Sequence, residues 1–449
     1  MTAITGHRRT FFHLLVSTLL VSVVNYTVWF AVTFWVYLQT RSVFATGLVA
    51  AVFLVLTALT GIWFGSLVDH HAKKTMMQVS AAVSFLLYAA AFAVYLVTPA
   101  ASFTDAGSVV LWAFVLLLMV GVIAGSIRTI ALPTLVTVLI DEDARDRANG
   151  LVGTTSGTSF LVTSVISGIL VGIDGMFWVL LPALVVLALA LAHLAFVPVP
   201  APAVAVPDGE ERRVDLRGTI RVVAEVPGLP ALIAFSAFNN LLGGVFMALL
   251  DAYGLSLVSV QAWGLLWGVL STGFIVGGLI VARTGLSRNP VRLLLLVNVA
   301  LWIVTLVFPL RSSVWLMAAG LYVYMLAVPF AEAAEQTILQ KVVPYERQGR
   351  VFGFAQSVEQ AASPLTAFLI APVAQFVVIP FMTDGAGART IGSWFGTGAD
   401  RGLALVFVLT GVIGLIATLA ALGSRPYRRL STRYTQNPVP AEPATAVTG

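Results

Sequence analysis

Long runs of residues without any Asp, Glu, Lys or Arg follow one another along almost the whole chain. Twelve of these runs reach 18 residues or more. About 20 apolar residues, at a helical rise of 1.5 Å each, span the roughly 30 Å hydrocarbon core of a bilayer. The pattern therefore predicts twelve transmembrane helices, within residues 10–40, 42–68, 75–104, 106–127, 148–173, 175–207, 226–250, 252–282, 293–310, 312–331, 360–383 and 402–424.

Composition leads to the same fold class and excludes several functions. Of the 449 residues, 59% are hydrophobic and only 10% are charged, whereas soluble domains average about 25% charged residues. The chain has no Cys, which excludes disulfide scaffolds and thiolate sites. It also contains neither a P-loop motif nor a nucleophile elbow. We therefore expect an all-α polytopic membrane protein that is not an enzyme and needs no cofactor.

The distribution of basic residues predicts the orientation. With both termini placed in the cytoplasm, the cytoplasmic segments collect 20 of the 25 Lys and Arg residues, while the external loops hold four and Arg128 falls inside a span. Lys and Arg accumulate on the cytoplasmic side of membrane proteins. We expect a multi-pass protein of the cell (plasma) membrane with both termini cytoplasmic. Topology and contact with anionic lipid also explain the net charge of +5, so no nucleic-acid partner is expected.

The chain divides into two similar halves. We predict an N-terminal bundle over 1–198, a cytoplasmic central loop over 199–229, a C-terminal bundle over 230–424 and a basic, Pro-rich disordered tail over 425–449. Within the loop, the spacing of Leu216, Ile220 and Val223 fits either a short helix on the membrane surface or a flexible linker.

Short motifs recur in the two halves. Ser22-x-x-Asn25 recurs as Ser236-x-x-Asn239 at an offset of 214 residues. At an offset of 203 residues, Asp143, Arg147 and Gly150 recur as Glu346, Arg350 and Gly353. A duplication of six spans favours a transporter over a channel or an enzyme.

The segment that follows the second predicted span carries a more specific motif. It reads Gly65-Ser-Leu-Val-Asp69-His-His-Ala-Lys73-Lys74, which resembles the loop 2–3 signature of the major facilitator superfamily. Asp69 at a helix end can meet the N-terminus of a neighbouring helix or an Arg. The resemblance implies two six-helix bundles related by a pseudo-twofold axis, transport by alternating access, and a gating role for Gly65, Asp69, Lys73 and Lys74.

Two further segments narrow the resemblance. Residues 128–136 with 145–150, and residues 343–353 in the second half, resemble the drug:proton antiporter branch that includes macrolide and siderophore exporters. This implies proton-driven export of a small hydrophobic or amphipathic compound, with substrate, protons and membrane lipid as partners, by a monomer. An importer or lipid flippase of the same fold, and a transport-inactive receptor or scaffold, remain alternatives.

Few ionisable residues fall inside the predicted spans, and such residues are functional candidates because burying a charge in lipid is costly. Glu332 and Glu335 share one helical face, so we predict that they carry the coupling proton, with Arg128 setting their pKa and Glu359 as second choice. Alternatively, Arg128 forms a structural ion pair with one of these acids and Glu359 pairs with a cytoplasmic Arg. Asp251 is expected at the external mouth.

The resemblance also implies that spans 1, 4, 7 and 10 line the substrate cavity. They offer aromatic and amide side chains, which suit an amphipathic or apolar solute. The expected cavity residues are Asn25, Tyr26, Trp29, Phe235, Phe238, Asn239, Asn240, Phe246 and Asp251.

Overall fold

The computed structural model describes residues 7–40, 43–199 and 216–436, and over these residues it contains helices and turns but no strand. Ten described helical segments are long and apolar enough to cross a membrane. The helices α2 and α6, of 28 and 30 residues, occupy the two remaining predicted spans. The expected all-α fold with twelve membrane helices is confirmed.

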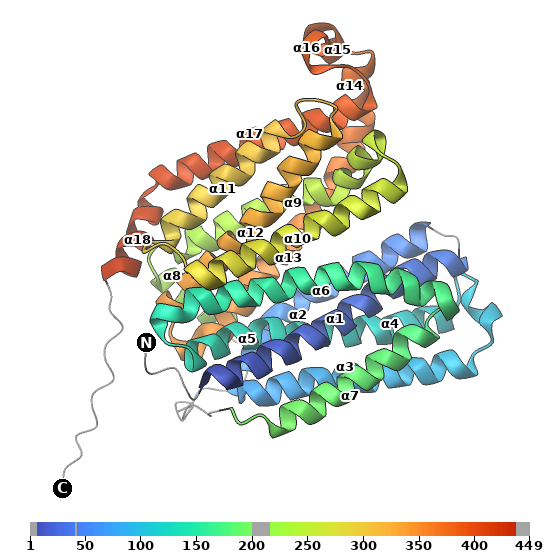
Figure 1. Cartoon of the computed structure of the whole chain (residues 1–449), viewed down its shortest axis with the longest axis vertical. Coiled ribbons are helices and arrows are strands. Elements are labelled where there is room, and N and C mark those ends of the chain that lie inside the picture. The colour runs from blue at the N-terminus through green and yellow to red at the C-terminus, as the bar shows by residue number, and fades with distance from the viewer. Residues whose placement is uncertain (1–6, 41–42, 200–215, 437–449) are drawn as a thin grey trace.

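Figure 1 shows the two halves as bundles that lie side by side. The first contains α1 (His7–Thr40), α2 (Val43–His70), α3 (Lys73–Val97), α4 (Val109–Ala124) with α5 (Ser126–Leu139), α6 (Arg145–Asp174) and α7 (Phe177–Phe196). The second contains α9 (Leu229–Leu257), α10 (Val260–Thr284), α11 (Pro290–Val307), α12 (Val314–Val342), α13 (Gln348–Val373), which continues through a π-helical segment into α14 (Ile379–Thr383), and α17 (Ala399–Gly423). The short helices α15 (Ala386–Thr390) and α16 (Gly392–Phe395) precede α17.

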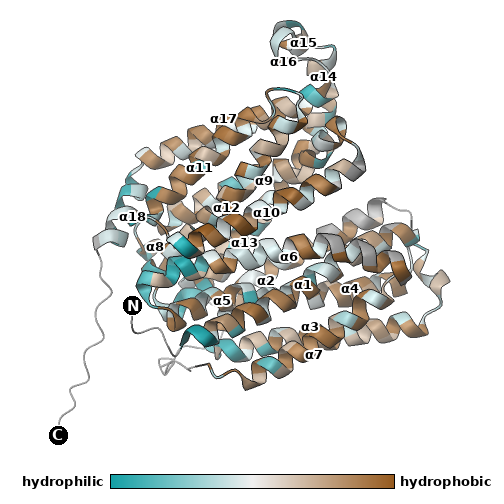
Figure 2. Ribbon diagram, viewed as in Figure 1, coloured by the Kyte–Doolittle hydropathy of each residue, from teal (hydrophilic) through white to brown (hydrophobic). Residues whose placement is uncertain are grey.

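The buried apolar residues show where the halves meet. One cluster draws residues from both halves, including Phe64, Val222, Leu339 and Leu430. A second cluster belongs to the first half alone and a third to the second half alone. The shared cluster lies at the end of the molecule where the described chain begins and ends, which we call the terminal end. Hydrophilic residues gather at the same end in Figure 2. The halves are therefore joined at the terminal end.

Two amphipathic helices cover the terminal end. The central loop contains α8 (Leu216–Glu225), so the helical alternative is correct over these residues, although Leu216 and Ile220 are exposed while Val223 is buried. Residues 200–215 lie outside the described part of the chain.

The disordered tail was predicted to begin at residue 425, which is too early. Residues 425–436 form α18 (Arg425–Gln436), because Leu430, which is 2% exposed, packs beside Gly228 at the start of α9. The remaining residues of the predicted tail, 437–449, lie outside the described residues.

A matched pair of hydrogen bonds explains one internal repeat. Tyr88 on α3 donates its hydroxyl to Asn25 Oδ1 on α1 at 2.7 Å, and Trp302 on α11 donates its indole N–H to Asn239 Oδ1 on α9 at 3.0 Å. The two aromatic donors are separated by the same 214 residues as the two Asn acceptors. The repeated Asn therefore fixes the first helix of each half to the third.

The orientation stays a prediction that cysteine labelling can test, since the chain has no Cys. Ser287 lies between α10 and α11 at the terminal end, Ser312 lies between α11 and α12 at the opposite end, and both are exposed. We expect Ser312→Cys to react with an impermeant thiol reagent in intact cells and Ser287→Cys to react only after permeabilisation. Labelling of Ser287→Cys in intact cells would reverse the assigned topology.

Candidate functional site

A polar cavity of about 400 Å³ lies between the two halves. Helices α1, α5 and α6 form one wall and α12 and α13 form the other. Hydroxyl and amide side chains dominate the first wall, while the second wall carries carboxyl groups and Gln. The polar lining residues are Thr18, Ser22, Tyr26, Arg128, Thr129, Asn149, Thr155, Ser156, Ser159, Glu332, Glu335, Gln336, Gln356, Glu359 and Gln360.

Three carboxyl groups predicted from the sequence meet in this cavity. Glu332 and Glu335 come from α12 and Glu359 from α13. Ser236 donates a hydrogen bond to Glu335 Oε1 at 2.8 Å. Three carboxyl groups from two adjacent helices therefore line one cavity.

Glu332 occupies a more open position than the other two acids. Its side chain is exposed, and a Cβ added to Gly153 of α6 would lie 3.9 Å from Oε2. Tyr26 of α1 lines the same cavity. Glu332 is thus the most exposed of the three acids that line the cavity.

Arg128 lies at the cavity wall but contacts neither Glu332 nor Glu335 through an ion pair. Its side chain is 1% exposed and donates to Ser17 Oγ at 3.2 Å and to the carbonyl of Met77 at 2.9 Å. In the described part of the chain no salt bridge joins it to an acid. The guanidinium therefore ties α5 to α1 and α3.

The predicted amides form hydrogen bonds within the protein. Asn25 and Asn239 hold the paired bonds described above. The side chain of Asn240 donates to the carbonyl of Ser236 on the same helix, and the backbone carbonyl of Asn240 accepts from Ser363 of α13. Of the predicted aromatic and amide residues, Tyr26 lines the cavity.

The remaining predicted cavity residues pack elsewhere. Trp29 contacts the ring of Phe30 edge-on and that of Phe53 at a tilt, and Phe246 packs against three aromatic rings of the second half. Phe235 lines a separate small pocket near the terminal end, and Phe238 is half-buried. Asp251 accepts hydrogen bonds from two indole N–H groups of α10 at 2.9 and 3.3 Å.

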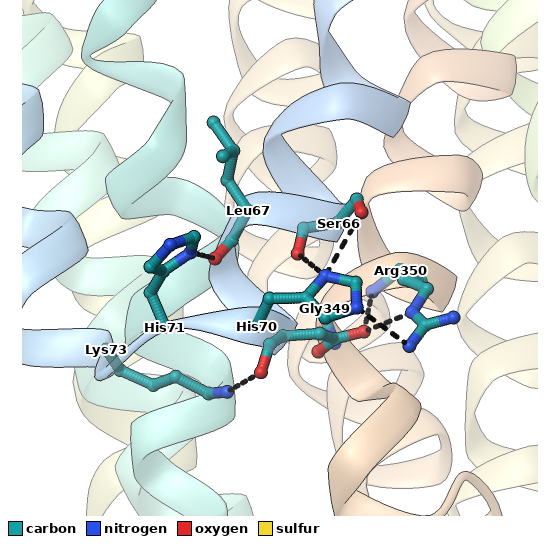
Figure 3. Close-up of polar contacts among 8 residues, drawn as sticks. Ser66, Leu67, His70, His71, Lys73, Gly349 and Arg350 are labelled. Carbon is teal, nitrogen blue, oxygen red and sulfur yellow. Dashed lines mark hydrogen bonds and ion pairs between the residues drawn. The ribbon is translucent and has the colours of Figure 1, made fainter. Parts of the chain in front are cut away.

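Below the cavity, Asp69 joins the two halves at the terminal end. Its Oδ1 accepts from the backbone N–H of Gly349 at 2.6 Å and its Oδ2 from that of Arg350 at 2.7 Å. The Arg350 guanidinium also lies 3.4 Å from Oδ2. Asp69 at the end of α2 thus caps the N-terminus of α13, where a helix favours negative charge. Figure 3 shows the side chains around this contact.

The neighbouring basic residues hold helix ends in place. Lys73, 5% exposed, donates to the carbonyl of Asp69 at 3.3 Å and lies 5.3 Å from the centre of the Tyr345 ring. Lys74 donates to the carbonyl of Ala195 at 3.2 Å. His70 accepts or donates at Ser66 and lies 3.5 Å from the Arg350 guanidinium.

Glycines bring the backbones of α2 and α13 together at this contact. A Cβ on Gly65 would meet the carbonyl oxygen of Gly349, and a Cβ on Gly353 would lie 2.9 Å from the Cα of Gly65. A Cβ on Gly61 would meet the Ser357 hydroxyl. The close approach that places Asp69 on α13 therefore depends on residues without a side chain.

Helices α6 and α10 form the second contact between the halves. Here the acidic residue comes from α6, and α10, the counterpart of α2, has none at the matching position. Gly150 and Gly278 allow a similar close approach, but α10 carries Ala282 where α2 carries its acid. Instead, Asp146 in the first turn of α6 accepts from the backbone N–H of Leu286 at 2.6 Å. At this interface the acid therefore lies on α6 and bonds to the backbone that follows α10.

A network of buried amide side chains, which was not predicted from the sequence, also joins the two halves at the terminal end. Asn149 donates to Thr337 and Gln340, both at 2.9 Å, and Gln340 donates to the carbonyl of Pro133 at 3.0 Å. Thr137 donates to Gln348 at 2.9 Å. The only signal in the sequence was the presence of amides near two predicted span ends.

Lys341 of α12 joins helix α18 to the first half at the terminal end. Lys341 forms a 2.6 Å salt bridge to Glu142 and lies 4.6 Å from the centre of the Tyr434 ring. Burial, together with Glu142 and Asp146, raises the pKa of the Tyr434 hydroxyl to about 12, so this phenol stays neutral.

We expect Asp69→Asn to slow transport more than it lowers thermal stability. The amide can accept only one of the two backbone N–H groups and removes the charge at the helix N-terminus, and charge-assisted bonds are about twice as strong as neutral ones. Turnover in proteoliposomes should fall about tenfold or more, as expected for a loss of 1–3 kcal/mol in one conformational state. A matching loss of folded protein in detergent would make Asp69 a purely structural residue.

Comparison of the sequence with known protein families identifies the family. The sequence profile of the Major Facilitator Superfamily matches residues 14–367. The chain belongs to this superfamily. It is therefore a secondary transporter and not an enzyme, with a small-molecule substrate and a lipid environment. No curated protein shows significant sequence similarity to the chain.

Solved structures of other transporters share the fold at low identity. The human organic anion transporter MFSD10 has a TM-score of 0.66 and 15% identity, over 91% of this chain and 99% of that chain. A bacterial homologue of the iron transporter ferroportin, in an outward-facing state, has a TM-score of 0.66 and 16% identity, over 93% and 100%. The proton:xylose symporter XylE has a TM-score of 0.63 and 13% identity, over 93% and 96%. These three similarities support the fold alone.

Proposed function

We propose that this protein exports a small amphipathic compound in exchange for protons. The observation that carries the proposal is the group of three carboxyls, Glu332, Glu335 and Glu359, at a cavity between the two halves. Ionisable groups at membrane depth are costly and are retained where they serve transport. The exposed carboxyl group of Glu332, with those of Glu335 and Glu359 beside it, provides sites where proton and substrate occupancy can exclude one another.

The closure at the terminal end is consistent with the proposed exchange. With the terminal end in the cytoplasm of the cell, as the basic residues predict, this conformation faces outward. Protons would reach the carboxyls from outside, and the contacts of Asp69 and Asn149 would break when the cavity opens inward. A single chain forms the cavity, so we propose that a monomer is sufficient.

The cavity lining supports an amphipathic solute that carries oxygen or nitrogen atoms. Hydroxyls of α1 and α6 and the amide of Gln356 face it, beside apolar residues such as Leu339 and Phe352. Drugs, macrolides and siderophores are the classes to test first. The cavity is more polar than the aromatic set expected from the sequence, since those aromatic residues pack within each half.

Substrate-stimulated proton flux in proteoliposomes tests the proposal. An exporter moves the solute and the proton in opposite directions, while an importer moves both in the same direction. A receptor or scaffold produces no flux, and a lipid flippase moves labelled lipid instead of the added solute. A growth-inhibition panel on an expressing strain, with and without an uncoupler, selects the solutes for this assay. Absence of opposed solute and proton movement with every solute selected in this way would contradict proton-coupled export.

A further inference from the structure

A second cavity of about 420 Å³, separate from the transport cavity, lies at the terminal end of the second half. Arg221 and Glu225 of α8, Arg347 of the turn before α13 and Arg433 of α18 line it, together with apolar residues. Arg221 is exposed, whereas Arg347 and Arg433 are half-buried. Three segments that are far apart in the sequence thus each contribute one guanidinium to one cavity.

We propose that this cavity binds a phosphate-bearing anion. Three Arg and one Glu line the cavity, so basic side chains predominate in its lining, and like charges that line one cavity favour an anion. The planar fork of Arg matches the oxygens of a phosphate group through paired hydrogen bonds. The arrangement therefore suits a phosphate better than it suits a neutral solute.

The surroundings of the cavity place it at the membrane surface. Helix α8 exposes Leu216 and Ile220 beside Arg217, a pattern typical of a helix that lies in the headgroup region. Anionic lipid headgroups concentrate at the cytoplasmic surface and attract Lys and Arg. A lipid phosphate and a free phosphate share the recognising chemistry, and the experiment below separates these two sources.

Binding at this cavity would act on the contact between the halves. Arg347 is the N-cap residue of α13, two positions before the Gly349 N–H that Asp69 accepts. An anion held by Arg221, Arg347 and Arg433 would fix α8 and α18 against the start of α13. The cavity is thus a place where lipid composition can influence opening at the terminal end.

The test compares the full-length protein with two paired variants in neutral detergent. Arg221→Gln with Arg433→Gln removes two guanidiniums from the cavity. Arg217→Gln with Arg429→Gln is the matched control, because these Arg lie on the same two helices, are exposed and do not line the cavity. Native mass spectrometry measures retained phosphatidylglycerol against phosphatidylcholine, and the melting temperature is recorded with each lipid and with inorganic phosphate.

We expect the wild type and the control pair to retain phosphatidylglycerol in preference to phosphatidylcholine, and the cavity pair to lose affinity by about tenfold or more, as expected for lost guanidinium–phosphate contacts. Stabilisation by inorganic phosphate in the wild type but not in the cavity pair would assign the site to free phosphate, whereas stabilisation by phosphatidylglycerol alone would assign it to lipid. Equal loss in the cavity and control pairs, or equal retention of the two lipids by the wild type, would overturn the proposal. If the cavity pair does not fold, the single variants Arg221→Gln and Arg433→Gln give the same comparison.

Discussion

Replacing Gly353 by Ala is expected to abolish transport while leaving each half folded. The added Cβ would lie 2.9 Å from the Cα of Gly65 and closer still to the carbonyl oxygen of Gly61, both on α2. Real Cβ atoms do not approach backbone this closely, so α2 and α13 must separate. Separation breaks the bonds from Gly349 and Arg350 to Asp69, and the state that is closed at the terminal end is lost.

Helix propensity makes this variant informative. Ala favours a helix over Gly by about 1 kcal/mol, so α13 itself should become more stable, and lost transport cannot be attributed to a weakened helix. Gly423→Ala is the matched control, because nothing lies within 4 Å of its added Cβ. It should transport at the wild-type rate.

The conformational part of this prediction has a direct measurement. Asp141 and Arg288 are exposed residues of opposite halves at the terminal end. Spin labels at Asp141→Cys and Arg288→Cys should move apart in the Gly353→Ala background and stay at the wild-type distance with Gly423→Ala. An unchanged distance combined with normal transport would show that α2 and α13 can adapt to a side chain here.

The number of membrane helices could be predicted from the sequence because the hydrocarbon thickness sets a minimum apolar length that is independent of packing. The lining of the cavity could not be predicted in the same way. A helix such as α9 is apolar around most of its circumference, so its pattern does not indicate which side faces another helix, lipid or solute. Asn239 illustrates this: an amide in a membrane helix signals a polar contact, but its partner is Trp302 of the same half.

The role of a charged residue could be predicted where its side chain has few possible hydrogen-bond or ion-pair partners. Asp69 could be placed at a helix N-terminus or an Arg, and it contacts both. Arg128 has five donors and many acceptable partners, and the structure pairs it with the Ser17 hydroxyl and a backbone carbonyl. Sequence spacing placed Glu332 and Glu335 on one face of α12, while the contact with Glu359 depends on how α12 packs against α13.

Helix α18 could not be predicted from the sequence, because few of its residues are apolar. Its 12 residues include four Arg and a Pro, and this composition resembles a solvated tail. A few apolar contacts are sufficient to order it, because Leu430 enters the shared core and Tyr434 lies against Lys341. Such a helix becomes apparent only when the surface that receives it is known.

Combined replacement of Glu332, Glu335 and Glu359 by Gln is expected to abolish proton-driven accumulation of substrate. Gln keeps the size of Glu and can still accept the hydrogen bond from Ser236, but it does not exchange a proton. One proton moving down one pH unit and 100 mV supplies about 3.7 kcal/mol, enough to sustain a gradient of several hundredfold for a neutral solute. Without the exchange, the solute should only equilibrate across the membrane.

Uptake into inside-out vesicles under an imposed pH gradient measures this effect and divides it among the three acids. We expect Glu332→Gln with Glu335→Gln to remove the response to the pH gradient, and Glu359→Gln alone to weaken it because the cavity then keeps two of its three carboxyl groups. Asp105→Asn, in an exposed turn outside the cavity, should accumulate substrate normally. If Glu332→Gln with Glu335→Gln still accumulates substrate in response to the pH gradient, Glu359 carries the proton, or Asp251 if the triple variant also responds.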